Sequence, residues 1–374
     1  MPLLPAVPPD RNMAAWSRQA RLPYAASRLF DKSRVVWHRL CLFPGHERMI
    51  TLPLAPDTPW LAPLAGFSDL PFRLLCRELG AACAVTEMVS AKGLFYDSRN
   101  TTRLVATVPA DAPLVVQLFG ADPAFLARAV ETLAARGHAF FDLNCGCSVR
   151  KVVKTGAGAA LLADPERLLA CVRAMHCAAG AAALGVKLRL GPTAPSRAAL
   201  DLAPRLAEAG ATWLTLHPRY ASQGFSGQAD RDALAAFVAA SPLPVLASGD
   251  LFDAASAADC LTATGAAGVM FARGALADPR IFTRFINVRR QSRGLDALPV
   301  PPLCDIIRRH AALCRRYDEG DRRTLLRMRT AVPRYLREIP GCRALRERLC
   351  HCMSWDEFDV IIDEAERLAS GESA

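Results

Sequence analysis

Short apolar runs recur between residues 60 and 275, and each is followed by an amphipathic segment rich in Ala, Leu and Arg. Continuous apolar runs are typical of parallel strands that are covered on both faces. Segments such as 122–136 and 252–264 carry apolar residues at the i, i+3, i+4 spacing of helices. The runs are WLAPLAG (60–66), AACAVTEMV (81–89), PLVVQLFG (113–120), AFFDLNCG (139–146), LGVKLRLG (184–191), TWLTLHP (212–218), PVLASGD (244–250) and AGVMFARG (267–274).

Eight strand–helix units predict an α/β fold, a closed (β/α)8 TIM barrel. The alternative is a doubly wound open sheet, but its usual G-x-G-x-x-G marker after the first strand is absent. The alternation ends at the Pro-rich segment 299–302, and the residues after it predict helices only. We therefore expect a catalytic barrel domain over 49–299 and a small all-helical domain over 300–374.

Residues 1–48 show no coherent periodicity and are rich in Arg. We interpret them as a basic N-terminal extension. It is either a flexible arm, a transit peptide, or upstream sequence that precedes a true start at Met49.

In a TIM barrel the chemistry lies at the carboxyl ends of the strands. Polar or cationic residues stand at nearly every such end, including Glu87, Gln117, Lys187 and His217. A barrel built only for stability does not need them there. The pattern therefore predicts an enzyme.

Composition also indicates where the protein is located and what it binds. No apolar run reaches the roughly 18–20 residues of a membrane span, and the N-terminus lacks a secretory pattern, so we expect a cytoplasmic protein without membrane contact.

The net charge of +10 is concentrated in 1–48 and 308–348, which favours a nucleic-acid partner. The 13 cysteines show no disulfide rhythm, and the spacing of Cys350-His351-Cys352 suits two metal ligands poorly. We expect reduced thiols and no metal.

Nine motifs, in order, resemble those of the flavin-dependent tRNA-dihydrouridine synthases of bacterial type. The resemblance covers the whole barrel and extends into the helical region, where RMRTAVPRYL (327–336) resembles an RNA-facing helix. The motifs are APLAGFSDLPFRLLCRELGA (62–81), TEM (86–88), VVQLFG (115–120), DLNCGC (142–147), KTGAGAALL (154–162), VKLRLG (186–191), LTLHPR (214–219), ASGD (247–250) and MFARGAL (270–276).

This resemblance implies NADPH-dependent reduction of the C5–C6 double bond of specific uridines in tRNA, with FMN as cofactor. It implies that Cys147 is the catalytic proton donor; a free thiol titrates near pH 8.5 and so carries a proton at neutral pH. Cys145, two residues earlier, is interpreted as structural. The implied cofactor-binding residues are Pro63, Leu64, Ala65, Gln117, Lys187, His217, Ser248, Gly249, Asp250, Ala272 and Arg273. The implied substrate-binding residues are Asn144, Arg189, Arg219, Lys151, Lys154, Arg327 and Arg329.

The sequence departs from the family pattern at several positions. Ser148 stands where Pro usually follows the cysteine, Ser248 where Asn is usual, and Thr330 where Lys is usual. Pro218 and Ala272 each replace Gly.

Two other functions fit part of the pattern. A dihydroorotate dehydrogenase-like FMN barrel acting on a free small molecule would leave the arginine-rich helices unexplained. A non-catalytic RNA-binding descendant would explain the arginines and purify without colour. We expect the chain to act as a monomer. The modified uridine and the choice between NADPH and NADH are not determined by the sequence.

Overall fold

The computed structural model describes residues 36–43, 46–96, 99–180, 182–317 and 320–371. Strands β1 (Val36–Phe43) and β2 (His46–Leu52) form an antiparallel hairpin before the barrel. The periodicity of the sequence did not predict this hairpin. The rest of the expected N-terminal extension, residues 1–35 and 44–45, lies outside the described residues.

The predicted barrel is confirmed. All eight apolar runs form parallel strands, and the sheet closes because β4 pairs with β6 as well as with β3. Strand β5 pairs with the last residues of β6 and completes the barrel strand that β4 begins. The strands are β3 (Trp60–Leu61), β4 (Cys83–Val85), β5 (Val89–Ser90), β6 (Leu114–Phe119), β7 (Phe140–Cys145), β8 (Ala183–Arg189), β9 (Trp213–His217), β10 (Val245–Ser248) and β11 (Gly268–Phe271).

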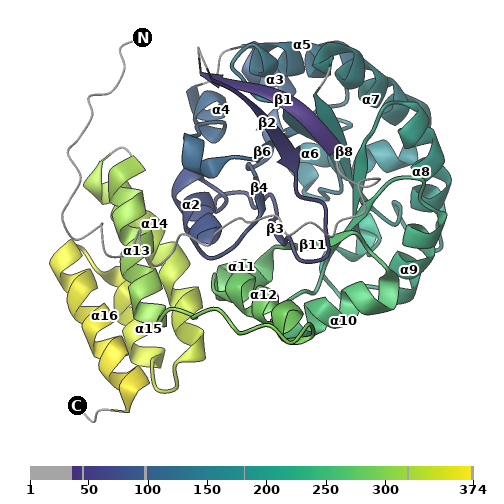
Figure 1. The fold of residues 1–374 in the computed structure, drawn as a ribbon. Coiled ribbons are helices and arrows are strands. Elements are labelled where there is room, and N and C mark those ends of the chain that lie inside the picture. Colours follow the sequence, from purple (N-terminus) through teal and green to yellow (C-terminus); the bar gives the residue numbers. More distant parts are fainter. Residues whose placement is uncertain (1–35, 44–45, 97–98, 181, 318–319, 372–374) are drawn as a thin grey trace. The chain divides into compact units, whose positions relative to one another are not determined.

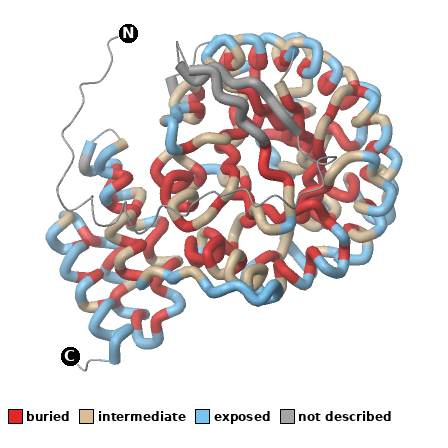
Figure 2. Tube along the Cα trace, viewed as in Figure 1, coloured by how far each residue is buried: buried red, intermediate tan, exposed pale blue. Residues whose placement is uncertain are grey.

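Helices surround the strands (Figure 1) and turn one buried face toward them (Figure 2). The helices of this part are α2 (Leu70–Glu78), α3 (Ala91–Phe95), α4 (Arg99–Leu104), α5 (Pro123–Ala134), α6 (Arg150–Val153), α7 (Pro165–Ala179), α8 (Ala198–Glu208), α9 (Arg231–Ala240), α10 (Ala254–Thr264), α11 (Arg273–Ala277) and α12 (Ile281–Gln291). Short 3-10 turns add η2 (Pro109–Asp111), η3 (Gly158–Ala163) and η4 (Ala221–Gln223).

Aspartate side chains begin many of these helices. Each accepts a hydrogen bond from a backbone N–H of the first turn, a group that otherwise lacks a partner. In three of these helices Pro follows at the first or second position, where its missing N–H costs nothing. The capping residues are Asp69, Asp122, Asp164, Asp230 and Asp253.

The two faces of the strands form separate apolar cores. The outward residues pack with the helices in one large cluster. The inward residues form a smaller cluster at the amino end of the barrel, where Trp60 and Trp213 meet edge to face at 6.0 Å. Gly185 pairs with Trp213 in the sheet, and any Cβ at Gly185 would collide with the Trp213 ring. Glycine is therefore required there.

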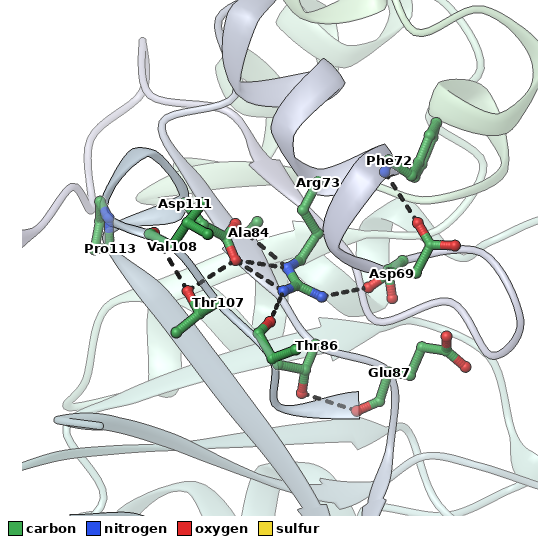
Figure 3. Close-up of polar contacts among 12 residues, drawn as sticks. Asp69, Phe72, Arg73, Ala84, Thr86, Glu87, Thr107, Val108, Asp111 and Pro113 are labelled. Carbon is green, nitrogen blue, oxygen red and sulfur yellow. Dashed lines mark hydrogen bonds and ion pairs between the residues drawn. The ribbon is translucent and has the colours of Figure 1, made fainter. Parts of the chain in front are cut away.

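A buried ion pair fixes the start of the barrel (Figure 3). Arg73 on α2 and Asp111 in η2 are both fully buried, and their nearest atoms are 2.8 Å apart. Arg73 also donates to the carbonyls of Ser68, at 2.9 Å, and Ala106, at 2.7 Å. The pair therefore ties the loop after β3 to the segment before β6. Sequence reasoning did not anticipate it.

The C-terminal part is helical, as predicted, and consists of α13 (Leu303–Tyr317), α14 (Asp321–Tyr335), η5 (Leu336–Glu338), α15 (Arg343–His351) and α16 (Trp355–Ser370). Charged side chains join it to the barrel. Arg309 on α13 binds Glu78 on α2 through two hydrogen bonds, at 2.8 and 2.5 Å. Arg327 on α14 pairs with Asp69, the cap of α2.

Candidate active site at the barrel mouth

Polar residues replace apolar ones along the inner face of the strands toward their carboxyl ends. The sheet register places these residues side by side on neighbouring strands. The predicted site residues Gln117, Asn144, Lys187 and His217 are therefore brought together, as their positions at strand ends indicated. The pairs are Gln117 with Asp142, Asn144 with Lys187, Lys187 with Thr215, and Arg189 with His217.

A directed chain of hydrogen bonds runs from Asp142 to the cysteine loop. Gln117 donates to the Asp142 carboxylate at 2.6 Å, and Asn144 donates to the Gln117 carbonyl oxygen at 2.8 Å. The Asn144 oxygen then accepts from the backbone N–H groups of Gly146, at 3.2 Å, and Cys147, at 2.9 Å. Because Asp142 accepts the Gln117 N–H, the Gln117 carbonyl oxygen is turned toward Asn144, so Asp142 sets the orientation of both amides.

Asp142 was missed as a site residue. Its sequence signal was a single charge inside an otherwise apolar run, 139–143. Burial raises the pKa of its carboxyl to about 7, although the Gln117 hydrogen bond and the Lys187 charge both lower it. One carboxylate oxygen, Oδ1, is buried without a hydrogen-bond partner.

Cys147 lies on the loop after β7 and is partly exposed. The η3 segment is hydrogen-bonded to this loop: the Ala159 N–H donates to the Cys147 carbonyl at 2.9 Å. Gly158 has φ +63°, and a Cβ there would lie 2.6 Å from the same carbonyl oxygen. The KTGAGAALL motif is thus a support for the cysteine. Cys145 is fully buried, and burial raises the pKa of its thiol well above the usual range.

Lys187 and His217 experience a strongly positive environment. Burial lowers the pKa of the Lys187 ammonium to about 8; nearby Asp142 raises it, and Arg189 lowers it. Burial also lowers the pKa of His217 to about 2, and the charges of Lys187, Arg189 and Arg219 add to the effect. Arg219 lies 3.1 Å from His217 Nε2 and can only donate, so His217 is neutral with its proton on Nδ1.

Arg189 and Arg219, predicted to contact substrate, bind the protein's own loops in this structure. Arg189 donates to the carbonyls of Gly146, at 2.8 Å, Tyr220, at 3.0 Å, and Gly224, at 2.8 Å. It therefore links the cysteine loop to the loop after β9.

Arg219 takes part in a charge cluster at the ends of β9, β10 and β11. Its two terminal nitrogens donate to Asp250 at 2.9 and 2.6 Å, and Arg273 donates to the same carboxylate at 2.8 Å. Partial burial opposes ionisation of Asp250, but the Arg219 and Ala229 hydrogen bonds lower its pKa overall. The predicted phosphate-binding residues lie at the carboxyl ends of the neighbouring strands β10 and β11: Ser248 ends β10, and Gly249, Asp250, Ala272 and Arg273 follow the two strands. The Asp250 side chain, however, accepts hydrogen bonds from Arg219 and Arg273.

The other predicted residues are placed around the rim. Pro63, Leu64 and Ala65 follow β3, and Ala65 is exposed. Lys151 and Lys154 are exposed at α6, just after the cysteine loop. On α14, Arg327 reaches Asp69 at the barrel, whereas Arg329 donates to the Cys350 carbonyl at 2.7 Å within the helical part.

No helix in the described ranges has the length and apolarity that crossing a bilayer requires. Among the same residues, no three or more His, Cys, Asp or Glu side chains are grouped as metal ligands would be.

The fold and site define a TIM-barrel protein with a thiol, a lysine and a neutral histidine at its mouth. A family model described as dihydrouridine synthase (Dus) matches residues 60–369. The chain belongs to this family.

Individual relatives agree with this. The chain is 34% identical over 305 residues to a probable tRNA-dihydrouridine synthase 1 of Synechocystis sp., covering 81% of this chain and 85% of the relative. It is 33% identical over 295 residues to tRNA-dihydrouridine synthase B of Pseudomonas aeruginosa, covering 78% and 87%. It is 40% identical over 223 residues to a probable tRNA-dihydrouridine synthase of Rhodobacter capsulatus, covering 59% and 68%.

Proposed function

We propose that this protein is a tRNA-dihydrouridine synthase that uses FMN and NADPH to reduce the C5–C6 double bond of specific uridines. The observation that carries the proposal is the position of Cys147. A partly exposed thiol stands on a supported loop at the mouth of a barrel of the dihydrouridine synthase family, beside a lysine and a neutral histidine.

The residues at the mouth fit an anionic, planar cofactor such as FMN. Burial lowers the pKa of Lys187 to about 8, so an anion beside its ammonium would relieve an existing penalty. Thr215 Oγ1 is also buried without a hydrogen-bond partner. Bound FMN would supply hydride to uracil C6 and would be regenerated by NADPH.

The residues that would hold FMN fall into three groups. Gln117, Lys187 and His217 would contact the ring. Residues 63–65 would line it. The backbone of Ser248, Gly249, Asp250, Ala272 and Arg273 would hold the phosphate at the loops that barrels commonly use for this purpose.

The protein's own chemical step is proton donation at carbon. The Cys147 Sγ–H donates its proton to C5 of the uracil and becomes a thiolate. An asparagine amide has two N–H donors, and one of those of Asn144 is used by Gln117. We assign the other to a uracil carbonyl, while the Asn144 oxygen holds the Cys147 backbone in place.

The remaining cations would bind tRNA. Extruding a uridine into the mouth costs a few kcal/mol of lost stacking and pairing, which phosphate contacts would offset. We assign such contacts to Lys151 and Lys154 beside the cysteine loop, and to Arg327 and Arg329 in residues 300–374, which we propose as the tRNA-binding domain. We place the activity in the cytoplasm. We also propose a monomer.

Mapping dihydrouridine in tRNA tests the proposal. A deletion strain is compared with wild type, and then complemented with wild-type protein or with Cys147→Ala. We expect loss of dihydrouridine at one or more positions, restored only by the wild-type protein. The purified Cys147→Ala protein should still bind flavin, because the thiol is not among the groups assigned to hold it. An unchanged map in the deletion strain would refute the function. Restoration by Cys147→Ala would remove the thiol from the mechanism.

A further inference from the structure

Two phenylalanine rings at the barrel mouth are exposed to solvent, although each is a large apolar group. Phe225, on the loop after β9, is 62% exposed, and Phe252, on the loop after β10, is 51% exposed. The Arg273 guanidinium carbon lies 4.4 Å from the Phe225 ring centroid and 4.9 Å from that of Phe252. We call Phe225, Phe252 and Arg273 the mouth platform.

Hydrogen bonds and an ion pair position the Phe225 loop and Arg273. Arg189, 4% exposed, donates to the carbonyls of Tyr220 and Gly224 on the loop that carries Phe225. Arg219, 2% exposed, donates to the carbonyls of Ser226 and Gly227 on the other side of Phe225. Two buried guanidiniums thus fix the Phe225 loop from both sides, while Asp250 anchors Arg273 at 2.8 Å.

The platform adjoins the catalytic machinery. The Phe225 ring centroid lies 6.0 Å from that of His217 and 5.7 Å from the Arg189 guanidinium carbon. Arg189 in turn binds the carbonyl of Gly146, the residue before Cys147. A planar group that rested on Phe225 would therefore lie next to the uracil that Cys147 protonates.

We propose that the mouth platform stacks a nucleobase of the tRNA that neighbours the target uridine. The inference rests on the proposed function. When the target uridine leaves the stack, its neighbours lose a stacking partner, and aromatic rings and guanidinium planes can replace that partner for any base. Arg273 is 38% exposed and adds a positive charge suited to the adjoining phosphate.

The nicotinamide or adenine ring of NADPH has the same planar aromatic chemistry. The preference for RNA comes from the composition of the platform: two exposed rings and a partly exposed guanidinium form an open, cationic surface. Such surfaces are typical of proteins that bind single-stranded nucleic acid.

The test distinguishes the effect of the aromatic ring of Phe225 from the effect of its apolar volume. Phe225→Leu keeps an apolar side chain but removes the ring, whereas Phe225→Trp keeps a ring. Affinity for unmodified tRNA is measured by filter binding at fixed salt, and flavin reduction by NADPH is followed by absorbance without tRNA. We expect Phe225→Leu to weaken tRNA binding roughly 5- to 150-fold, the range expected for one lost base–aromatic stack, and Phe225→Trp to bind nearly as wild type. Flavin reduction should be unchanged in both.

Phe95→Ala is the matched control. Phe95 is 53% exposed and packs edge to face on Tyr96 and Phe125, each at 5.1 Å between centroids, and it has no part in the proposed site. It should leave tRNA affinity unchanged.

Two results would overturn the inference. In one, Phe225→Leu and Phe252→Leu both bind tRNA as tightly as Phe95→Ala. In the other, flavin reduction by NADPH slows while tRNA affinity is unchanged, which would assign the platform to the dinucleotide. Failure of the proposed function itself looks different: wild-type protein would neither bind tRNA nor alter its dihydrouridine map.

Discussion

The two ends of the barrel are built from the same strands and differ in chemistry. At the amino end, inward residues such as Trp60, Phe140 and Trp213 form an apolar cluster. Further along the same inner face, Asp142 and Asn144 follow Phe140 on β7, and Thr215 and His217 follow Trp213 on β9. One end is therefore stabilised by burial of apolar area, while the other holds groups that prefer water.

Burial has opposite effects on stability at the two ends of the barrel. At the amino end every buried ring contributes favourably to folding. At the mouth, burial shifts the pKa of Asp142 to about 7 and that of Lys187 to about 8, in each case toward the neutral form. Each charged state is thus less stable in the folded protein than in water. Substitutions at the two ends should separate stability from activity.

The largest effect is expected at the amino end. Trp213→Ala removes a fully buried ring and should lower the free energy of unfolding by about 3–5 kcal/mol. Turnover per flavin-loaded molecule should stay close to wild type, because Trp213 lies in the apolar cluster of the amino end. Urea unfolding and steady-state kinetics measure the two quantities, with Phe95→Ala as an exposed control. Full stability in Trp213→Ala would contradict this account of the amino end.

The next effect concerns the hydrogen-bond chain at the mouth. Asp142→Leu removes the acceptor that orients Gln117, so the Asn144 oxygen is no longer directed at the Cys147 loop. We expect kcat/KM for tRNA, measured per flavin-loaded molecule, to fall about 10-fold or more. Asp142→Asn keeps a carbonyl oxygen that can accept from Gln117 and should recover most of the loss. Equal activity of the Leu and Asn variants would show that Asp142 does not orient this chain.

The last effect depends on pH and concerns the charge of Lys187. Its folded pKa of about 8 lies below the usual 10.5, so between these values the unfolded chain binds more protons and stability rises with pH. The destabilisation is complete below about pH 8. Lys187→Met should therefore raise the unfolding free energy of flavin-free protein by on the order of 3 kcal/mol near neutral pH. The gain should disappear above about pH 10.5, where Lys187 is neutral in both the folded and the unfolded chain. The activity of Lys187→Met should be lower than that of the wild-type protein. Urea unfolding at about pH 6 and pH 10 checks the sign; a larger gain at the higher pH would contradict it.

Much of this protein was determined by sequence pattern alone. The apolar runs determined the barrel strands, because strands covered on both faces need continuous apolar residues. They also determined that Gln117, Asn144, Lys187 and His217 meet, because the carboxyl ends of parallel strands all lie at the same edge of the sheet. The DLNCGC motif, which forms the carboxyl end of one of these strands and the start of the next loop, determined that Cys147 lies at the same edge.

Tertiary structure decided what the pattern left open. Arg73 and Asp111 are 38 residues apart, and only the fold shows that they form a buried pair. The structure also showed that Asp142 orients two amides, and that Arg189 and Arg219 bind loop carbonyls. Periodicity reports which face of an element is apolar, but the partner of a buried polar group depends on the fold of the whole barrel. Hydrogen bonds form between groups that are close in space, and a sequence pattern does not record that distance.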